Sequence, residues 1–200
     1  MKRLSTIALS LAMLVGLFGC EEITNLALID VPITSNINFS STGNVAPSTS
    51  NDCVDLSDNK DFNDNKSRIK SAEVQEAWVR IANLSSPQFS SPGTTLDNAV
   101  LSSARYVLTF DPEYGDTKEY LLGTATNVPL KDLVTSAENL KGYKITIDNA
   151  AISPAANLIS RRPKFCIRSE YGPLVGGGTV TSPAMNGTFA LTFKFKVDPL

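Results

Sequence analysis

The ten residues Thr188–Val197 read TFALTFKFKV, and this stretch decides the fold class. Its apolar side chains occupy every second position, namely Phe189, Leu191, Phe193, Phe195 and Val197. Successive side chains of a β-strand point to opposite faces, so a period of two indicates a strand with one buried side and one side facing solvent. The stretch therefore predicts a half-buried strand near the end of the sequence.

The same period recurs earlier in the chain. Asp30–Ser40 alternates in this way, and Pro32 favours an edge position because proline cannot donate to a β-ladder. Ser103–Asp111 and Lys118–Thr124 flank a turn and predict a hairpin. The other predicted strands are Ser67–Asn83 (one long strand or two bent ones), Tyr143–Ile147 and Lys164–Ser169. About seven strands in all predict a mainly β domain, most simply a two-sheet β-sandwich.

One helical pattern stands among these strands. Pro129–Lys141 carries an apolar stripe at helical spacing, Asn127 is a candidate cap, and Gly142 follows directly, as glycine often does after a helix. We therefore expect one amphipathic helix over 129–141 and a second, short helix near 57–66. Residues 40–52, 84–98 and 172–182 are predicted to be loops, the last of them alternatively a flexible hairpin.

Composition excludes several kinds of chemistry. The 200 residues include no histidine, so the chain alone cannot build a Ser–His–Asp or Cys–His relay or a histidine-ligated metal or haem site. The formal net charge is -2, which gives no broad basic surface for nucleic acid. We expect no cofactor and no nucleic-acid partner.

The N-terminus has the pattern of an export signal. Lys2 and Arg3 precede a short apolar run that ends at Leu17-Phe18-Gly19-Cys20. This ending resembles the lipobox of bacterial lipoproteins, although Phe18 stands where a smaller residue is usual. The resemblance implies that residues 1–19 are removed, that Cys20 carries lipid such as palmitate, and that residues 20–25 form a tether to one domain over 26–200. It also implies a place in the bacterial cell envelope, more readily at the outer membrane than at the inner, facing the periplasm or the exterior.

Two further cysteines remain, Cys53 and Cys166. In an exported chain a pair of thiols most often forms a disulfide bond. The alternative is two free, buried cysteines.

Four weaker patterns suggest binding or catalytic residues. Oxygen ligands at alternate positions suit calcium, and the candidates are Asp58, Asp61, Asn63 and Asn65, although Lys66 and Ala72 break the EF-hand pattern. Asp111 and Glu113 form a carboxylate pair that a turn also explains. Candidate contact residues are Arg161 and Arg162 in a small basic patch, and Tyr114 and Tyr171 in predicted turns.

No coherent catalytic set emerges from these residues. We therefore expect a non-catalytic binding or structural module that is anchored to the membrane and meets an envelope protein or glycan. One alternative is a glycan hydrolase that uses carboxylates. Another is a carrier of apolar ligands, with its pocket between the helix predicted at 129–141 and the sheet.

Overall fold

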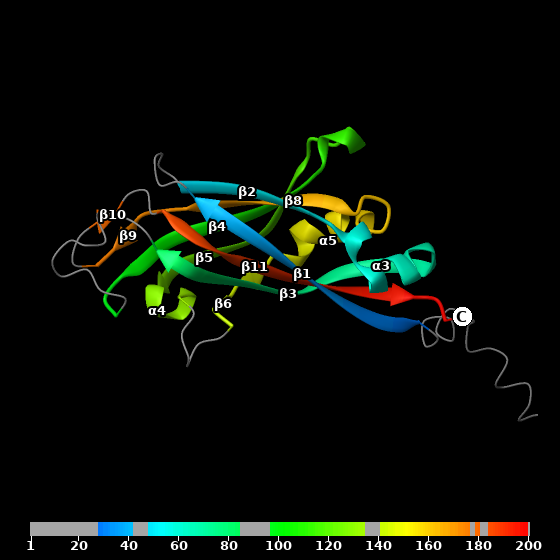
Figure 1. Cartoon of the computed structure of the whole chain (residues 1–200), viewed down its shortest axis with the longest axis horizontal. Helices are drawn as coiled ribbons and strands as arrows, with labels where there is room; N and C mark the ends of the chain where they lie inside the picture. Colours follow the sequence, from blue (N-terminus) through cyan, green and yellow to red (C-terminus); the bar gives the residue numbers. More distant parts are fainter. Residues whose placement is uncertain are drawn as a thin grey trace, which may run out of the picture.

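The structure is a computed structural model and describes residues 28–41, 48–84, 97–134, 141–176, 179–180 and 184–199. Within these ranges the chain forms two antiparallel β-sheets that pack together, with few helices (Figure 1). The mainly β, two-sheet sandwich expected from the sequence is confirmed. The predicted signal, Cys20 and the tether lie outside the described residues.

The first sheet, sheet A, is built around the stretch that opened the sequence analysis. Its order is β1 (Ile29–Ser41), β11 (Met185–Val197), β3 (Ile69–Leu84) and β6 (Tyr143–Lys144). β11 pairs with β1 along its whole length and with β3 on its other side, so its alternate apolar side chains point into the core. β1 is an edge strand, as Pro32 predicted, and the stretch around Trp78 is one long strand.

The second sheet, sheet B, has β4 (Val100–Phe110) near its centre. On one side β4 pairs with β5 (Glu119–Pro129), which confirms the predicted hairpin, and β5 pairs with β7 (Thr146–Ile147). On its other side β4 pairs with β8 (Lys164–Tyr171) and then with β9 (Leu174–Val175). β9 forms a short hairpin with β10 (Thr179–Val180), within the region predicted as a loop or hairpin.

One strand of sheet B lies where the sequence predicted a loop. β2 (Ser48–Asp55) pairs with β8 over all eight of its residues, although it reads STSNDCVD and the prediction for 40–52 was a loop. Its polar sequence has low strand propensity, so pairing with β8 and the covalent bond of Cys53 must outweigh that propensity.

A five-residue segment, Tyr143–Ile147, joins the two sheets at one side of the sandwich. β6 pairs with β3 of sheet A, the Ile145 amide donates to the Ala77 carbonyl at 2.9 Å, and β7 pairs with β5 of sheet B. Gly123 in β5 permits this contact, since a Cβ there would lie 2.3 Å from the Thr146 carbonyl oxygen.

The helix predicted over 129–141 is wrong. Only α4 (Leu130–Leu133) is helical at this place, because Val134 is extended and forms a parallel bridge with Ile81. Pro129 belongs to β5, and Asn127 lies within that strand rather than capping a helix. Residues 135–140 lie outside the described residues.

The longest described helix is one that the sequence did not predict. It is α5 (Asn149–Leu158), and its Asp148 cap accepts a hydrogen bond from the Ala151 amide at 3.0 Å. The buried side of α5, which includes Ile152, packs against β3 and β5. Pro154 stands on the exposed side of the helix.

Short helices cluster before β3, near the predicted 57–66. They are η1 (Leu56–Asp58), α3 (Lys60–Asn65) and η2 (Lys66–Arg68), and η4 (Pro112–Tyr114) forms the β4–β5 turn. The side chain of Asp55 caps η1 and that of Asn59 caps α3, which accounts for the short helical segment predicted near 57–66.

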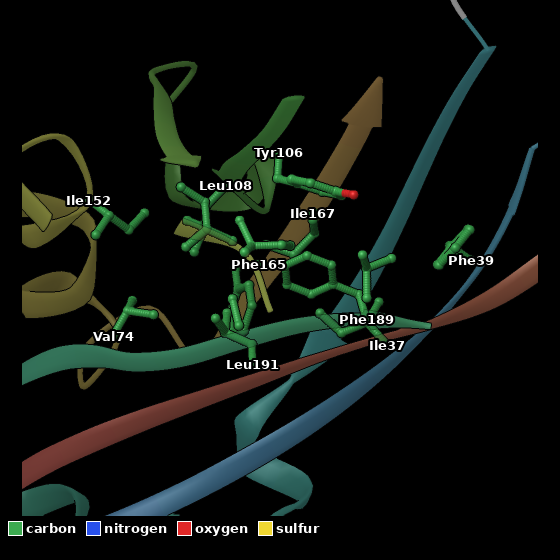
Figure 2. Close-up of a cluster of buried hydrophobic side chains, with 14 of the residues drawn as sticks. Ile37, Phe39, Val74, Tyr106, Leu108, Ile152, Phe165, Ile167, Phe189 and Leu191 are labelled. Carbon is green, nitrogen blue, oxygen red and sulfur yellow. The ribbon is translucent and has the colours of Figure 1, made fainter. Parts of the chain in front are cut away.

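The core lies between the two sheets (Figure 2). Aromatic rings from both sheets meet there, with Phe165 of sheet B 5.6 Å from Phe193 of sheet A and Tyr106 5.3 Å from Phe189. α3 adds Phe62, which packs edge-to-face on Phe195. This rigid interior holds the outward-facing side chains of sheet B in fixed rows.

Candidate functional site

The outer face of sheet B brings together polar side chains from four strands. Strand pairing places them in rows across β2, β8, β4 and β5. One row contains Cys53, Cys166, Thr109 and Glu119; the next contains Asn51, Arg168, Val107 and Leu121; a third contains Thr49, Glu170, Arg105 and Thr124. Ser103 and Thr126 face each other beyond the third row. We call this surface the B face.

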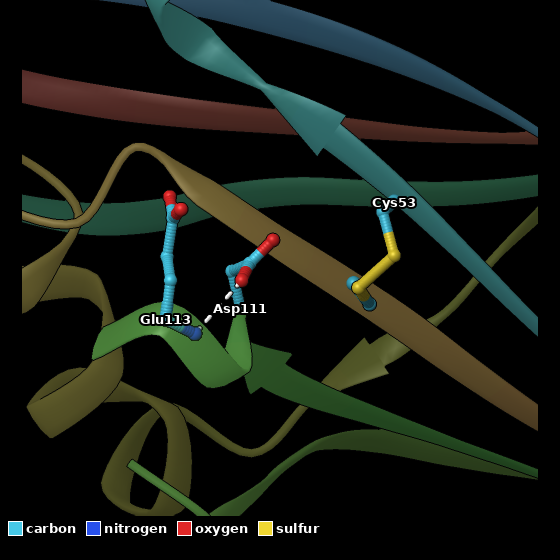
Figure 3. Close-up of a disulfide and its surroundings, with 4 residues drawn as sticks. Cys53, Asp111 and Glu113 are labelled. Carbon is cyan, nitrogen blue, oxygen red and sulfur yellow. Dashed lines mark hydrogen bonds between the residues drawn. A yellow bond between two sulfur atoms is a disulfide. The ribbon is translucent and has the colours of Figure 1, made fainter. Parts of the chain in front are cut away.

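The predicted disulfide is present at one end of the B face (Figure 3). Cys53 and Cys166 are direct partners on β2 and β8, with their Cα atoms 3.9 Å apart. Cys53 is exposed, whereas Cys166 is buried. The bond therefore ties the edge strand β2 to the sheet on its outer side.

The carboxylates near the disulfide have structural partners. Asp111 accepts from the Glu113 amide at 2.9 Å, and Asp55 accepts from the Ser57 amide at 2.8 Å. Glu113 forms an ion pair with the Lys164 ammonium group at 2.9 Å and so raises the pKa of Lys164. Asp55, Asp111 and Lys164 line a shallow pocket of about 170 Å³ beside the disulfide. These carboxylates hold turns and one lysine, and nothing in their geometry favours glycan hydrolysis.

An ion-pair network occupies the middle of the B face. The Arg168 guanidinium donates to both oxygens of Glu119, at 2.6 and 2.9 Å, and to Glu170 at 3.1 Å. Its hydrogen bonds lower the pKa of Glu119. Arg105 reaches Glu170 from the neighbouring strand at 3.3 Å. Val107, in the same row as Arg168, is fully buried, so the charged side chains lie across an apolar position and hold one another in place.

A groove of about 440 Å³ lies at the far end of the B face from the disulfide. Its lining is small or hydroxylated apart from one ion pair, and consists of Ser103, Ala104, Arg105, Thr124, Ala125, Thr126, Glu170 and Gly172. Gly172 is required for this shape, because a Cβ there would lie 2.4 Å from the Ser103 hydroxyl oxygen. The volume is within the range of small-ligand sites, and the hydroxyl groups and ion pair can both donate and accept hydrogen bonds.

Sequence reasoning did not identify this groove. The available signal was the predicted hairpin, whose arms Ser103–Asp111 and Lys118–Thr124 carry Arg105 and its partner Thr124. Thr126, the partner of Ser103, lies two residues beyond the predicted second arm. Reading this signal requires the strand register and the pairing with Glu170 of β8, which the sequence alone does not provide.

Two of the four calcium candidates, Asn63 and Asn65, point their side-chain oxygens at cations. The Asn63 side-chain oxygen accepts from the Lys66 ammonium group at 3.1 Å, and that of Asn65 accepts from the Arg68 guanidinium at 2.7 Å. Asp58 and Asp61 lie in the same short helices, η1 and α3. Among the described residues, no group of three or more acidic or cysteine side chains is arranged to hold a metal ion.

The predicted contact residues do not come together. Tyr171 is fully buried in β8, so its prediction as a surface residue is wrong: the strand continues two residues beyond Ser169. Tyr114 is half-buried, and its hydroxyl accepts from the Lys164 amide at 3.4 Å. Arg162 pairs with Asp116 and lies over the Phe110 ring, while Arg161 is exposed.

Comparison with known proteins adds little to this geometry. No protein-family model and no curated protein matches the chain. Among solved structures, a chain of desmodium yellow mottle tymovirus is similar at a TM-score of 0.29 and 11% identity, covering 86% of this chain and 90% of its own. A similarity at this score supports no argument about fold or function. Among the helices of the described ranges, none has the length and apolar character needed to span a membrane.

Proposed function

We propose that the protein is a membrane-anchored bacterial lipoprotein that acts as a non-catalytic binding module in the cell envelope. The groove on the B face is the observation that carries the binding part of this proposal. Hydroxyl groups and an Arg–Glu pair around a shallow groove suit a ligand rich in hydrogen-bonding groups, and an envelope glycan is the class that fits best. The anchor rests on the lipobox-like Leu17-Phe18-Gly19-Cys20.

The arrangement of the chain agrees with this assignment. Seven residues separate Cys20 from Leu28, and the eight Cα–Cα steps between the two span at most about 28 Å when fully extended. β1 begins beside the end of β11, whereas β9, which follows shortly after Gly172, lies toward the opposite end of the long axis (Figure 1). An anchor at Cys20 would therefore keep the Ile29 end near the membrane and direct the groove away from it.

The anchor is tested by fractionating cells that produce the Cys20→Ala variant. We expect this variant to leave the membrane fraction and to lose labelling by radioactive palmitate. Phe18→Ala is the matched control, because it moves the sequence closer to the usual lipobox and should leave both properties intact. Membrane association of Cys20→Ala equal to that of the native chain would exclude the anchor.

The binding part is tested with purified peptidoglycan sacculi as the probe. We expect the detergent-solubilised full chain to sediment with sacculi, and Thr126→Arg to weaken this by on the order of tenfold because the new side chain fills the groove. Asn36→Arg is the control, since Asn36 is exposed on the outer face of sheet A. The glycan assignment fails if the native chain stays in solution or if the two variants sediment equally.

A further inference from the structure

Five polar side chains face the interior of the sandwich rather than the B face. Ser50, Ser169 and Tyr106 are direct neighbours across β2, β8 and β4. Asp52 follows two residues after Ser50 on β2, and Tyr171 follows two residues after Ser169 on β8. Because side chains two apart share a face, all five lie on one inner patch of sheet B. We call them the inner polar cluster.

The oxygens of this cluster are buried and have no protein partner outside the cluster. Tyr106 and Tyr171 are 0% exposed, Ser169 is 1% exposed, and Asp52 is half-buried with one carboxylate oxygen buried. Within the cluster the Ser50 hydroxyl lies close to Asp52, and the Tyr171 hydroxyl lies close to those of Ser169 and Tyr106, but none of these contacts has the geometry of a full hydrogen bond. Folded proteins satisfy most buried polar groups, so five such oxygens in one place indicate a site that something else occupies.

The surroundings offer these oxygens neither a cation nor a donor from the opposite sheet. Phe39 of sheet A packs on the ring of Tyr171 at 5.7 Å. Phe189 of sheet A packs on the ring of Tyr106 at 5.3 Å (Figure 2). The neighbouring inward-facing side chains are also uncharged: Ile37 on β1, Leu108 on β4 and Ile167 on β8. Of the cluster tyrosines, Tyr171 interacts electrostatically with Asp52, and Tyr106 interacts with Tyr171 and Tyr143.

We propose that the inner polar cluster is a hydrated proton-binding site. Bound water joins the four hydroxyl groups to Asp52, and the aspartate holds a proton while β2 is fully paired with β8. A buried water typically makes about three hydrogen bonds, and hydroxyl groups can serve it as donors or acceptors. A protonated carboxyl can do the same, whereas an ionised one only accepts and brings an unpaired charge into an apolar seam.

Protonation of Asp52 stabilises β2, the edge strand of sheet B on which it lies. Burial raises the pKa of Asp52 above 3.8, and the nearby Ser50 hydroxyl opposes this only in part. A raised native pKa means that the stabilisation is complete below the unfolded-state pKa and is lost as the pH rises through the native value. When Asp52 loses its proton, the pairing of β2 with β8 weakens. Cys53 stays bonded to Cys166, so the weakened part of β2 is Ser48–Asp52, which precedes the disulfide.

The direct test follows the Asp52 carboxyl carbon by NMR as the pH is changed. We expect Asp52 to titrate above the ordinary aspartate value of 3.8. Ser50→Ala should move the Asp52 titration still higher, because the hydroxyl that favours the ionised form is gone. Titration of Asp52 at or below the ordinary aspartate value would overturn the proton-binding site.

The coupling to β2 is tested by hydrogen exchange. Between pH of about 4 and about 7, we expect protection factors of the Ser50–Asp52 amides to fall, because Asp52 loses its proton over this range and the stabilisation that the proton gives is lost with it. Asp52→Asn should abolish this fall, and Asp58→Asn, the matched control, should keep it. A fall that persists in Asp52→Asn would overturn the coupling.

The water is tested separately, in the native chain. We expect NMR cross-relaxation between bound water and protons of Ser169 and Tyr171, and we expect Tyr171→Phe to raise the unfolding equilibrium constant by about tenfold, since it leaves the water and its other partners unsatisfied. Absence of water contacts, or a Tyr171→Phe variant as stable as the native chain, would remove the hydration. The NMR measurements need no variant and remain decisive if a substitution prevents folding.

Discussion

Removing the disulfide should cost the fold more than most single changes. The bond between Cys53 and Cys166 spans 113 residues. In the loop-entropy model a cross-link of this span stabilises the native state by about 5 kcal/mol at 25 °C, because it removes many conformations of the unfolded chain. The effect should be close to its full value, since the two strands are already paired in register at this point and no backbone shift is needed.

The assay is urea unfolding of the Cys53→Ala/Cys166→Ala double variant against its parent, followed by the fluorescence of Trp78, the only tryptophan. For a urea dependence of about 2 kcal/mol per molar, the midpoint should fall by about 2.5 M. Both proteins carry Cys20→Ala, so that lipid and a free thiol do not differ between them. Reducing the parent with dithiothreitol should reproduce the double variant. A loss of stability below about 1 kcal/mol would refute the reasoning, because the cross-link would then contribute far less than the loop model requires.

Three further perturbations test other parts of the structure. Gly123→Ala should lower the melting temperature by about 4 to 8 °C, because its Cβ would meet the Thr146 carbonyl oxygen at 2.3 Å. The control is Gly115→Ala, which has open space around the new Cβ but a φ of +67° and should cost only about 1 kcal/mol of stability. Equal losses of stability in the two variants would contradict the proposed contact. Asp148→Ala should destabilise by about 1 kcal/mol in urea unfolding through loss of the α5 cap, with Asp148→Asn nearly neutral, and an unchanged alanine variant would speak against the cap. Hydrogen bonds from the Lys118 amide and the Arg162 guanidinium lower the pKa of Asp116, so the stability that ionised Asp116 contributes is present above the unfolded-state pKa and is lost as the pH falls through the native pKa. Asp116→Asn should therefore make the unfolding free energy depend less on pH below about 4. An unchanged pH dependence in this variant would count against the pairing.

Strand periodicity predicted the parts of the fold in which one side of a strand is buried. β11, β1 and the β4–β5 hairpin follow the period of two because their inner side chains must be apolar and their outer ones need not be. β2 was missed because its inner positions carry Ser50 and Asp52, so its sequence lacks that contrast. Its place depends on pairing with β8, which no local pattern in 48–55 reveals.

The helices also show that tertiary contacts can override a local sequence pattern. The stripe Leu130, Leu133 and Val134 has helical spacing, yet Val134 is drawn into a parallel bridge with Ile81, a tertiary contact that overrides local preference. α5 went unnoticed because Pro154 interrupts it, although Asp148 offered a capping signal. The groove on the B face depends on the register among three strands, so its lining could not be predicted from the sequence. The disulfide at the other end of the B face could be, because it needs only two cysteines in an exported chain.

The pairing of β1 with β11 has a mechanical consequence. Ile29 lies opposite Val197, so the two strand ends meet at one end of the molecule. A pull that separates these two ends would open the strand pair one hydrogen bond at a time, like a zipper. A pull on Ile29 against a load held at the groove end would instead act along the strands and stress many of the bonds from Ile29 to Ser41 together. The same sheet is therefore weak to peeling from its paired ends and resistant to shear along its length.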